Sequence, residues 1–195
     1  MRRITQIILT FILSLSFSLN VHADESSSQL IKAMQSKGHV LMLRHAIAPG
    51  YGDPDNIKIG DCNTQRNLDS SGRQQSTEIG NWLRQYDIQP SAIYSSQWCR
   101  CLETAQLLNL GEVNELNALN SFFQMPQNRD KDLTALKSFI AKQDSDQNLI
   151  IMVTHSVTIS AISGQNVASG NGVLLKLNSS GSYEFVAVVN PKNNN

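Results

Sequence analysis

The chain lacks an excess of charge of either sign, and this limits its partners. Its 195 residues include 16 Lys and Arg against 16 Asp and Glu, a formal net charge of zero. Removing Arg2 and Arg3, which lie in a segment expected to be cleaved, leaves 14 basic residues against 16 acidic ones and a net charge of −2. Such a balance gives no support to binding of nucleic acid or of an anionic membrane surface. Recognition of an anion therefore requires a local cluster of basic side chains.

Long apolar runs are also scarce, apart from one at the N-terminus. A basic start (Met1-Arg2-Arg3) is followed by an apolar stretch over residues 7–19 and by the small-residue cleavage site Val21-His22-Ala23. This pattern predicts a secretory signal peptide over residues 1–23, because the apolar stretch is too short for a comfortable membrane span. We expect a single mature domain, residues 24–195, with no stable membrane anchor. It would be secreted across the inner membrane into the periplasm.

Cysteine is rare, with only Cys62, Cys99 and Cys101 present. In an oxidising compartment three cysteines predict one disulfide and one free thiol. Cys99 and Cys101 are two residues apart, which is poor geometry for a mutual bond on a helix. We therefore expect Cys62 to pair with Cys99 or Cys101, with three unpaired buried thiols as the alternative. Either bond would tie the loop after residue 45 to the segment that carries Arg100.

Several catalytic motifs are missing as well. No His-x-x-x-His pair occurs, so no metal site and no cofactor are expected. No cysteine is followed by Arg at the Cys-x5-Arg spacing of cysteine phosphatases, and no Gly-x-Ser-x-Gly elbow occurs. The Asp53-Pro54-Asp55 string lies in a Gly/Pro loop and does not end an apolar strand, as an aspartyl-phosphate motif would. The string Cys99-Arg100-Cys101 lacks the Cys-x-x-Cys spacing of thiol redox proteins.

Two apolar runs that end in a histidine are the most informative feature present. Residues 41–46 read Leu-Met-Leu-Arg-His-Ala, and residues 150–156 read Ile-Ile-Met-Val-Thr-His-Ser. Each run predicts a strand that is buried on both faces. Ligands of open α/β sheets bind at the carboxyl ends of such strands. Arg44, His45 and His155 are therefore expected at one site for an anionic substrate.

The rest of the chain alternates expected helices and strands. Helices are expected over 26–37, 70–86, 95–110, 132–143 and 157–163, and strands over 39–43, 90–94, 113–119, 150–154, 173–177 and 183–189. The last two strands form a hairpin with its turn at 179–181. Between the first strand and the second helix, residues 46–66 form a polar loop long enough to be functional. This order predicts an α/β fold, a three-layer α/β/α sandwich with a mainly parallel central sheet.

Arg100 is the fourth candidate site residue. We expect it one turn into a helix that begins at Ser95-Ser96, where backbone N–H groups also point at an anion. Guanidinium groups present forked donors that suit phosphate oxygens, and an imidazole can act as a nucleophile. Together with Arg44, His45 and His155, Arg100 predicts a phosphoryl-transfer site that needs no metal.

At these residues the chain resembles the histidine phosphatase superfamily, also called the phosphoglycerate mutase-like family. The family's Arg-His-Gly motif is similar to residues 44–46, with alanine in place of glycine. Its Leu-Thr-x-x-Gly-x-x-Gln-Ala string is similar to residues 68–76, and its Ser-Ser-x-x-x-Arg-x-x-x-Thr-Ala string to residues 95–105. Its late Thr-His-Gly resembles residues 154–156. The matches run in this order from about residue 40 to residue 175 and imply a phosphoglycerate mutase-like fold.

The resemblance also implies roles. His45 would be the nucleophile and form a phosphohistidine that water hydrolyses, while Arg44, Arg100 and His155 would bind and stabilise the phosphoryl group. The implied activity is hydrolysis of a phosphomonoester, on a small molecule or on a glycan- or lipid-linked phosphate. The cysteine-containing loop is similar to that of an exported branch, some of whose members act on lipopolysaccharide core phosphates. The alternative is a non-catalytic protein that binds a phosphate ligand on the same scaffold.

One departure from the family concerns the general acid. Many members carry a carboxylate where residues 119–124 here read Leu-Asn-Ser-Phe-Phe-Gln. Either another carboxylate protonates the leaving group, or the leaving group needs little help. General acid catalysis contributes about 10²- to 10⁴-fold in rate. The candidate carboxylates are Glu115 and Asp130 near that region, and Asp53, Asp55 and Asp61 in the loop.

Other basic side chains have less specific roles. Arg66 is expected to pair with Asp61 or Asp69 rather than to bind substrate, and His39, which begins a strand, is expected to be structural. A mutase activity is not favoured, because transfer between bisphosphates requires a more basic pocket.

Overall fold

The computed structural model describes residues 26–192. The expected signal peptide and its cleavage site lie outside the described residues. The first described element is a helix over residues 26–35, which buries Leu30, Ile31 and Met34. Within residues 26–192, no helix combines the length and the apolar character needed to cross a membrane.

Six strands form one sheet in the order β3-β2-β4-β1-β5-β6. The pairs β1–β4, β4–β2 and β2–β3 are parallel, whereas β5 runs antiparallel to β1 and to β6. The sheet is therefore mainly parallel with an antiparallel hairpin at one edge, as the sequence predicts. The strands are β1 (His39–Arg44), β2 (Ala92–Ser95), β3 (Val113–Glu115), β4 (Ile150–Thr154), β5 (Gly172–Leu177) and β6 (Tyr183–Val189).

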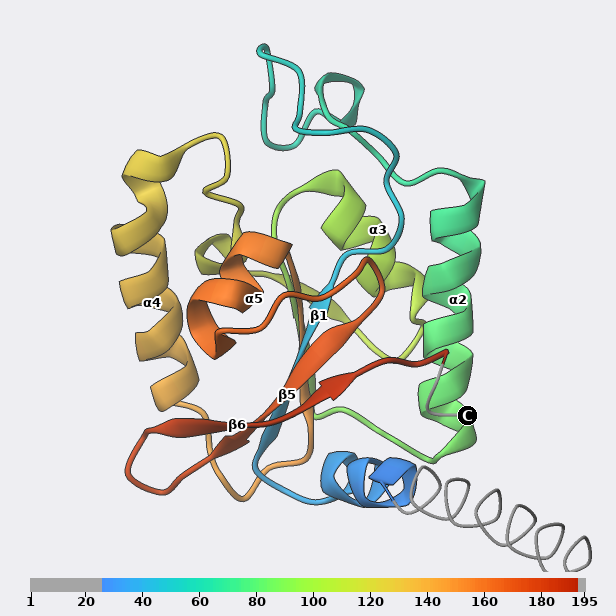
Figure 1. Ribbon diagram of the computed structural model, residues 1–195, viewed down its shortest axis with the longest axis vertical. Coiled ribbons are helices and arrows are strands. Elements are labelled where there is room, and N and C mark those ends of the chain that lie inside the picture. The colour runs from blue at the N-terminus through green and yellow to red at the C-terminus, as the bar shows by residue number, and fades with distance from the viewer. Residues whose placement is uncertain (1–25, 193–195) are drawn as a thin grey trace, which may run out of the picture.

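Helices cover both faces of this sheet, which confirms the three-layer α/β/α sandwich (Figure 1). On one face lie the helix over residues 26–35, α2 (Ser70–Gln85) and α3 (Cys99–Leu107). On the other lie α4 (Arg129–Ala141) and α5 (Ser156–Ser163). The short 3-10 helices are η1 (Cys62–Thr64), η2 (Asn117–Leu119) and η3 (Pro126–Asn128).

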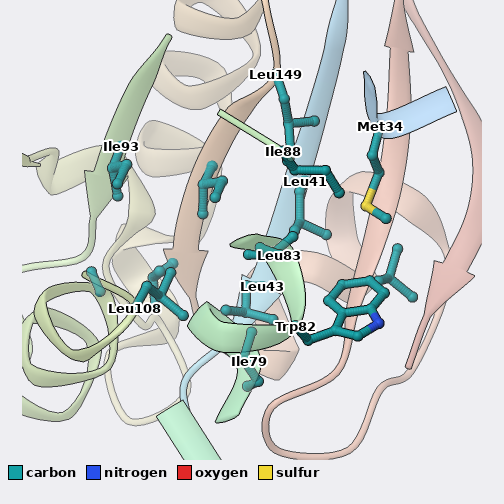
Figure 2. Close-up of a cluster of buried hydrophobic side chains, with 14 of the residues drawn as sticks. Met34, Leu41, Leu43, Ile79, Trp82, Leu83, Ile88, Ile93, Leu108 and Leu149 are labelled. Carbon is teal, nitrogen blue, oxygen red and sulfur yellow. The ribbon is translucent and has the colours of Figure 1, made fainter. Parts of the chain in front are cut away.

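Alternate residues of the central strands enter two separate apolar clusters. Leu41 and Leu43 of β1 pack toward α2 and α3, with Trp82 and Leu83 of α2 (Figure 2). Val40 and Met42 of the same strand pack toward α4 and α5. Because both faces of β1 and β4 are covered, nearly every position in them must be apolar, and the strands read as continuous apolar runs.

The strand register brings the residues after β1, β2 and β4 to the same edge of the sheet. Arg44 pairs with Thr154, and Ser95 pairs with Val153. The His45 amide donates to the Thr154 carbonyl at 2.9 Å, and the Ser96 amide donates to the Val153 carbonyl at 2.9 Å. These bonds extend the ladder beyond the strands and place His45 close to His155.

Several expected element boundaries differ from the structure by one to four residues, and the largest differences concern the helix that carries Arg100 and the strand after it. The helix that carries Arg100 begins at Cys99, not at Ser95-Ser96, so Arg100 is its second residue. Its N-cap position is Trp98, which makes no side-chain capping bond. The strand expected over residues 113–119 ends at Glu115, because its only neighbour β2 ends at Ser95, the residue that Glu115 faces. Residues 117–119 form η2 instead.

The disulfide joins Cys62 to Cys99, with 5.7 Å between their Cα atoms. This confirms that Cys62 is bonded and selects Cys99 as its partner. Cys101 is a buried free thiol. Two residues of a helix differ by about 200° in direction, so Cys99 faces the loop while Cys101 faces the sheet.

Replacing both bonded cysteines, in a Cys62→Ser/Cys99→Ser variant, should lower the free energy of unfolding by about 2–4 kcal/mol. The bond closes a segment with a sequence separation of 37, and its removal restores chain entropy to the unfolded state. Urea unfolding monitored by circular dichroism measures the difference. As a control, a reducing agent should shift the wild type toward the variant and leave the variant unchanged. Equal midpoints for the oxidised wild type and the variant would contradict the prediction.

Candidate active site

The four predicted site residues line one pocket, of about 460 Å³, at the carboxyl edge of β1 and β4. Arg44 and His45 come from the end of β1, Arg100 from the first turn of α3, and His155 from the residue before α5. The two imidazole rings meet edge to face, with 5.5 Å between their centroids. The structure therefore brings together all four residues that the sequence predicts.

His45 is held in one orientation and as one tautomer. Its Nδ1–H donates to the Ala46 carbonyl at 2.8 Å, so the lone pair is on Nε2. The Nε–H of Arg100 donates toward this nitrogen at 3.3 Å. Burial, followed by the positive charge of Arg100, lowers the pKa of His45 to about 3. His45 is therefore neutral at physiological pH, with a lone pair available as a nucleophile.

His155 takes part in a short chain of polar contacts. Its Nε2 lies 2.9 Å from the Ser96 hydroxyl, which donates to Asn120 Oδ1 at 3.1 Å. The backbone N–H of Gln97 also donates to this atom of Asn120, at 2.9 Å, which identifies the atom as the amide oxygen. Since the O–H of Ser96 is used in the bond to Asn120, Ser96 Oγ must accept a hydrogen bond from His155, which places the imidazole proton on Nε2. Asn120 thus orients a site residue, a role that the sequence analysis missed.

The buried thiol of Cys101 borders the same histidine, 3.4 Å from its Nε2. Burial raises the pKa of Cys101 to about 12, so it remains a neutral thiol. Burial, then the proximity of His45 and Arg100, holds the pKa of His155 well below its usual value. Both imidazoles are therefore uncharged in the free protein, and the positive charge of the pocket resides on arginines.

Asp53 forms a bidentate ion pair with Arg100. The distances are 2.8 Å from Nη1 to Oδ1 and 3.1 Å from Nη2 to Oδ2, and the two side chains are 3% and 5% exposed. Asp53 also accepts hydrogen bonds from the Arg66 amide at 2.9 Å and from Trp98 Nε1 at 3.1 Å. Burial alone would raise the pKa of Asp53, but the hydrogen bonds from Arg100, Arg66 and Trp98 outweigh it and lower the pKa. Asp53 is therefore ionised, and it orients Arg100.

Asp53 is also the only candidate acid among the residues that line this pocket. Glu115 is exposed and accepts from Gln97, and Asp130 is exposed and pairs with Arg129. Asp61 caps η1, and Asp55 lines a neighbouring cavity. Because Asp53 is ionised, the pocket offers no protonated carboxyl group from the described residues.

Arg66 lies in the pocket, contrary to the expectation that it pairs with Asp61 or Asp69. Asp69 instead caps α2 by accepting from the Gly72 amide at 2.7 Å, and Asp61 is occupied in capping η1. Arg66 Nε donates to the Gly52 carbonyl at 2.8 Å, and Nη1 donates to the Ala48 carbonyl. No property of Arg66 in the sequence marks this role except its position just after Cys62, in the loop that the disulfide ties to α3.

Arg44 is the third arginine of the pocket. Its Nη1 donates to the Val167 carbonyl at 2.8 Å, and its Nε is buried with no hydrogen-bond partner in residues 26–192. Burial, and next the charge of Arg100, lower the pKa values of both Arg44 and Arg66. A bound anion would relieve the repulsion among these three cations.

The remaining motif residues hold the backbone that follows His45. Thr104 Oγ1 accepts from the Ala46 amide at 3.1 Å and donates to the Arg100 carbonyl at 2.6 Å. Gln75 accepts from the Ile47 amide at 3.0 Å. At position 72 only glycine fits, because a Cβ there would lie 2.0 Å from the Ile47 carbonyl oxygen. The motifs over residues 44–46, 68–76 and 95–105 therefore meet in the structure and position the backbone next to His45.

Metal ligands are not clustered in the described part of the chain. Within residues 26–192, no group of three or more His, Cys, Asp and Glu side chains is arranged to hold a metal ion. His39 lies at the opposite end of β1 from the pocket, where its Nδ1 is 3.2 Å from the Ser36 hydroxyl. The positive charge that faces a ligand here comes from Arg44, Arg66 and Arg100.

Comparison with known families agrees with this arrangement. Residues 40–122 match the model of the histidine phosphatase superfamily (branch 1). The matched segment contains Arg44, His45, Asp53, Arg66 and Arg100. No curated protein matches the chain in sequence.

Solved structures share the phosphoglycerate mutase-like fold at low sequence identity. The protein histidine phosphatase SixA, complexed with tungstate, superposes with a TM-score of 0.57 at 15% identity, over 80% of this chain and 98% of its own. The alpha-ribazole phosphatase from Shigella flexneri gives 0.59 at 12%, over 78% and 96%. A phosphoserine phosphatase mutant from Entamoeba histolytica, in complex with phosphoserine, gives 0.56 at 14%, over 80% and 98%. At these sequence identities, the structural similarity is evidence for the fold alone.

Replacing Arg66 by glutamine should weaken binding of inorganic phosphate about 10- to 100-fold. One charge-assisted hydrogen bond contributes about 1.5–3 kcal/mol, and each 1.4 kcal/mol is tenfold in affinity. Isothermal titration calorimetry measures the change. Arg129→Gln is the matched control, because Arg129 is exposed on α4 and pairs with Asp130. An unchanged affinity in Arg66→Gln would show that Arg66 only supports the loop.

Acidification should destabilise the protein through its buried histidines. The folded pKa values of His45 and His155 lie below the unfolded value of about 6.5, so the unfolded chain binds protons first as the pH falls. The free energy of unfolding should be constant above about pH 6.5. Below that pH it should fall by about 1.4 kcal/mol per pH unit for each histidine that stays neutral in the folded state, and for His45 this continues to about pH 3. Urea unfolding between pH 7.5 and 4.5 measures this slope, which should be shallower in His45→Asn. Equal slopes would refute the assignment.

Proposed function

We propose that the protein hydrolyses a phosphomonoester through a phosphohistidine on His45, that it needs no metal, and that it works after export to the periplasm. The observation that carries the proposal is the state of His45. It is a neutral imidazole whose Nε2 lone pair lies 3.3 Å from the Nε of Arg100, in a pocket that Arg44 and Arg66 also line. A nucleophile beside three fixed cations suits attack on a phosphate dianion.

In the first step, Nε2 of His45 attacks phosphorus. A new N–P bond forms, and the bond between phosphorus and the ester oxygen breaks, with its electron pair leaving on that oxygen. Nδ1 keeps its proton and its bond to the Ala46 carbonyl, which stabilises the positive charge that develops on the ring. The three arginines neutralise the equatorial oxygens, where negative charge collects in the transition state.

In the second step, water attacks the phosphohistidine. The N–P bond breaks, its electrons return to Nε2, and inorganic phosphate leaves the pocket. The proton that water loses balances the proton that the departing ester oxygen takes up from solvent. The arginines supply the charge stabilisation that a metal provides in other phosphatases, and this is the ground for proposing metal independence.

The solved structures of similar fold support a phosphoryl substrate. They include a protein histidine phosphatase with tungstate and a phosphoserine phosphatase with phosphoserine. Here we propose a small molecule or a glycan- or lipid-linked phosphate as the substrate. Export is supported by the signal-like residues 1–23 and by the Cys62–Cys99 disulfide, since such bonds persist in oxidising compartments.

A phosphate-binding protein without turnover is the second candidate. It is favoured by one observation, the ionised Asp53, which leaves the pocket with no protonated carboxyl to assist a leaving group. The two candidates differ in whether a phosphorylated His45 forms.

Hydrolysis of p-nitrophenyl phosphate in the presence of a chelator tests the proposal. The wild type should be active, and His45→Ala should lose at least about 10³-fold in kcat/KM, because the covalent step is removed. His39→Asn is the control, a histidine on the same strand outside the pocket, and should retain activity. Acid quenching followed by mass spectrometry should find a phosphoryl group on the peptide that contains His45. Phosphate binding with no hydrolysis and no phosphorylated peptide would favour the binding protein.

A further inference from the structure

Two exposed aromatic side chains stand at the mouth of the pocket. Tyr51 is 87% exposed and Phe123 is 45% exposed, and both line the pocket that contains His45. Their rings meet edge to face, with 5.2 Å between centroids and an interplanar angle of 90°. They come from segments far apart in the sequence, so the contact is a feature of the folded mouth. Large apolar surface left open beside a polar pocket is typical of a ligand-binding site.

A tight turn and a side-chain bridge bring the two segments that carry these rings together. Gly50 and Gly52, on either side of Tyr51, have φ values of +96° and +68°, a conformation that permits the tight turn presenting the tyrosine. The Gln124 side chain joins the two segments: its Oε1 accepts from the Asp53 amide at 2.6 Å, and its Nε2 donates to the Asp53 carbonyl at 3.0 Å. The aromatic pair is therefore attached to the residue that orients Arg100.

The net charge of the pocket lining is equal and opposite to that of one phosphate dianion. Its charged lining groups are Arg44, Arg66, Arg100 and Asp53, and the two histidines are neutral. The lining thus carries a formal charge of +2, which balances the dianion of a phosphomonoester. No carboxylate or lysine among the lining residues remains to pair with a charged group on the rest of the substrate. The part of the substrate at the mouth should therefore be uncharged.

The lack of a proton donor restricts the leaving group further. Asp53 is ionised, and the remaining hydroxyl and amide groups of the lining are much weaker acids than a carboxyl group. They belong to Tyr51, Ser121, Gln124, Ser156 and Ser169. An alkoxide leaves slowly without a proton, whereas a phenol-like oxygen leaves as a stable anion. The mouth therefore offers contacts for a ring but no protonated carboxyl group for a leaving oxygen.

We propose that the mouth formed by Tyr51 and Phe123 is a subsite for an uncharged aromatic ring, and that the substrate class is aryl phosphomonoesters. This inference rests on the proposed function, because it names the substrate of the same site. The ring stacks against Tyr51 and Phe123 while its phosphate lies between the arginines. The P–O bond to the ring breaks as the N–P bond to His45 forms, and the aryloxide takes a proton from solvent water.

Steady-state kinetics test the substrate class. The full chain should prefer phenyl phosphate over cyclohexyl phosphate and over phosphoserine by at least about 100-fold in kcat/KM. With substituted phenyl phosphates, kcat/KM should rise steeply as the phenol becomes more acidic, since no acid assists departure. Equal values for phenyl and cyclohexyl phosphate, or a flat dependence on phenol acidity, would overturn the proposal.

Binding tests the subsite without turnover. Phenylphosphonate should bind at least about tenfold more tightly than methylphosphonate in the wild type, and Phe123→Ala and Tyr51→Ala should each reduce that preference several-fold. Neither variant should change the affinity for inorganic phosphate, which reports the arginines alone. Phe185→Ala is the control, since Phe185 is an exposed aromatic residue on β6 that does not line the pocket. Equal affinity for the two phosphonates in the wild type would refute the subsite.

The two experiments separate the failure of the inference from that of the proposed function. If the protein binds phenylphosphonate selectively but hydrolyses no ester and forms no phosphorylated His45, the subsite stands and the catalytic proposal fails. If esters are hydrolysed without preference for rings, catalysis stands and the subsite fails.

Discussion

The buried ion pair between Asp53 and Arg100 is the interaction on which the rest of the site depends. It connects the loop after β1 to the first turn of α3, and it points the guanidinium of Arg100 at Nε2 of His45. The Asp53 carboxylate also accepts a hydrogen bond from the Arg66 amide. The backbone N–H and carbonyl of Asp53 bond to the side chain of Gln124. A buried charge requires a partner, so the loop has to adopt the one arrangement that delivers Asp53 to Arg100.

This pair also determines the electrostatics of the pocket. It neutralises one of three arginines, so the lining balances a phosphate dianion without becoming basic enough for a bisphosphate. It keeps Asp53 ionised, which removes the only lining carboxylate as a proton donor. Burial and the adjacent cations keep both imidazoles neutral, so the nucleophile needs no base to activate it. Charge balance and leaving-group preference thus have one physical origin.

Most of the fold and four of the site residues were predictable, because their signals are local. Apolar runs ending in His45 and His155 mark buried parallel strands, and parallel strands deliver their following residues to one edge. The boundaries of α3 and β3 were not predictable, since β3 ends where its only partner ends and α3 lacks a side-chain cap. Arg66 was assigned to Asp61 or Asp69 because sequence proximity does not reveal that those carboxylates already cap helices.

The sequence by itself determined the strand–helix alternation, the order of the motifs, and the pairing of arginine and histidine at a strand end. Each depends on side-chain type and on spacing along one element. Only the tertiary structure decided which carboxylate meets Arg100, that Cys62 bonds to Cys99, and that Tyr51 meets Phe123 at the mouth. Each of these contacts joins the long loop after β1 to a residue distant in sequence. The conformation of that loop depends on burial and charge pairing in three dimensions, and neither leaves a periodic pattern in the sequence.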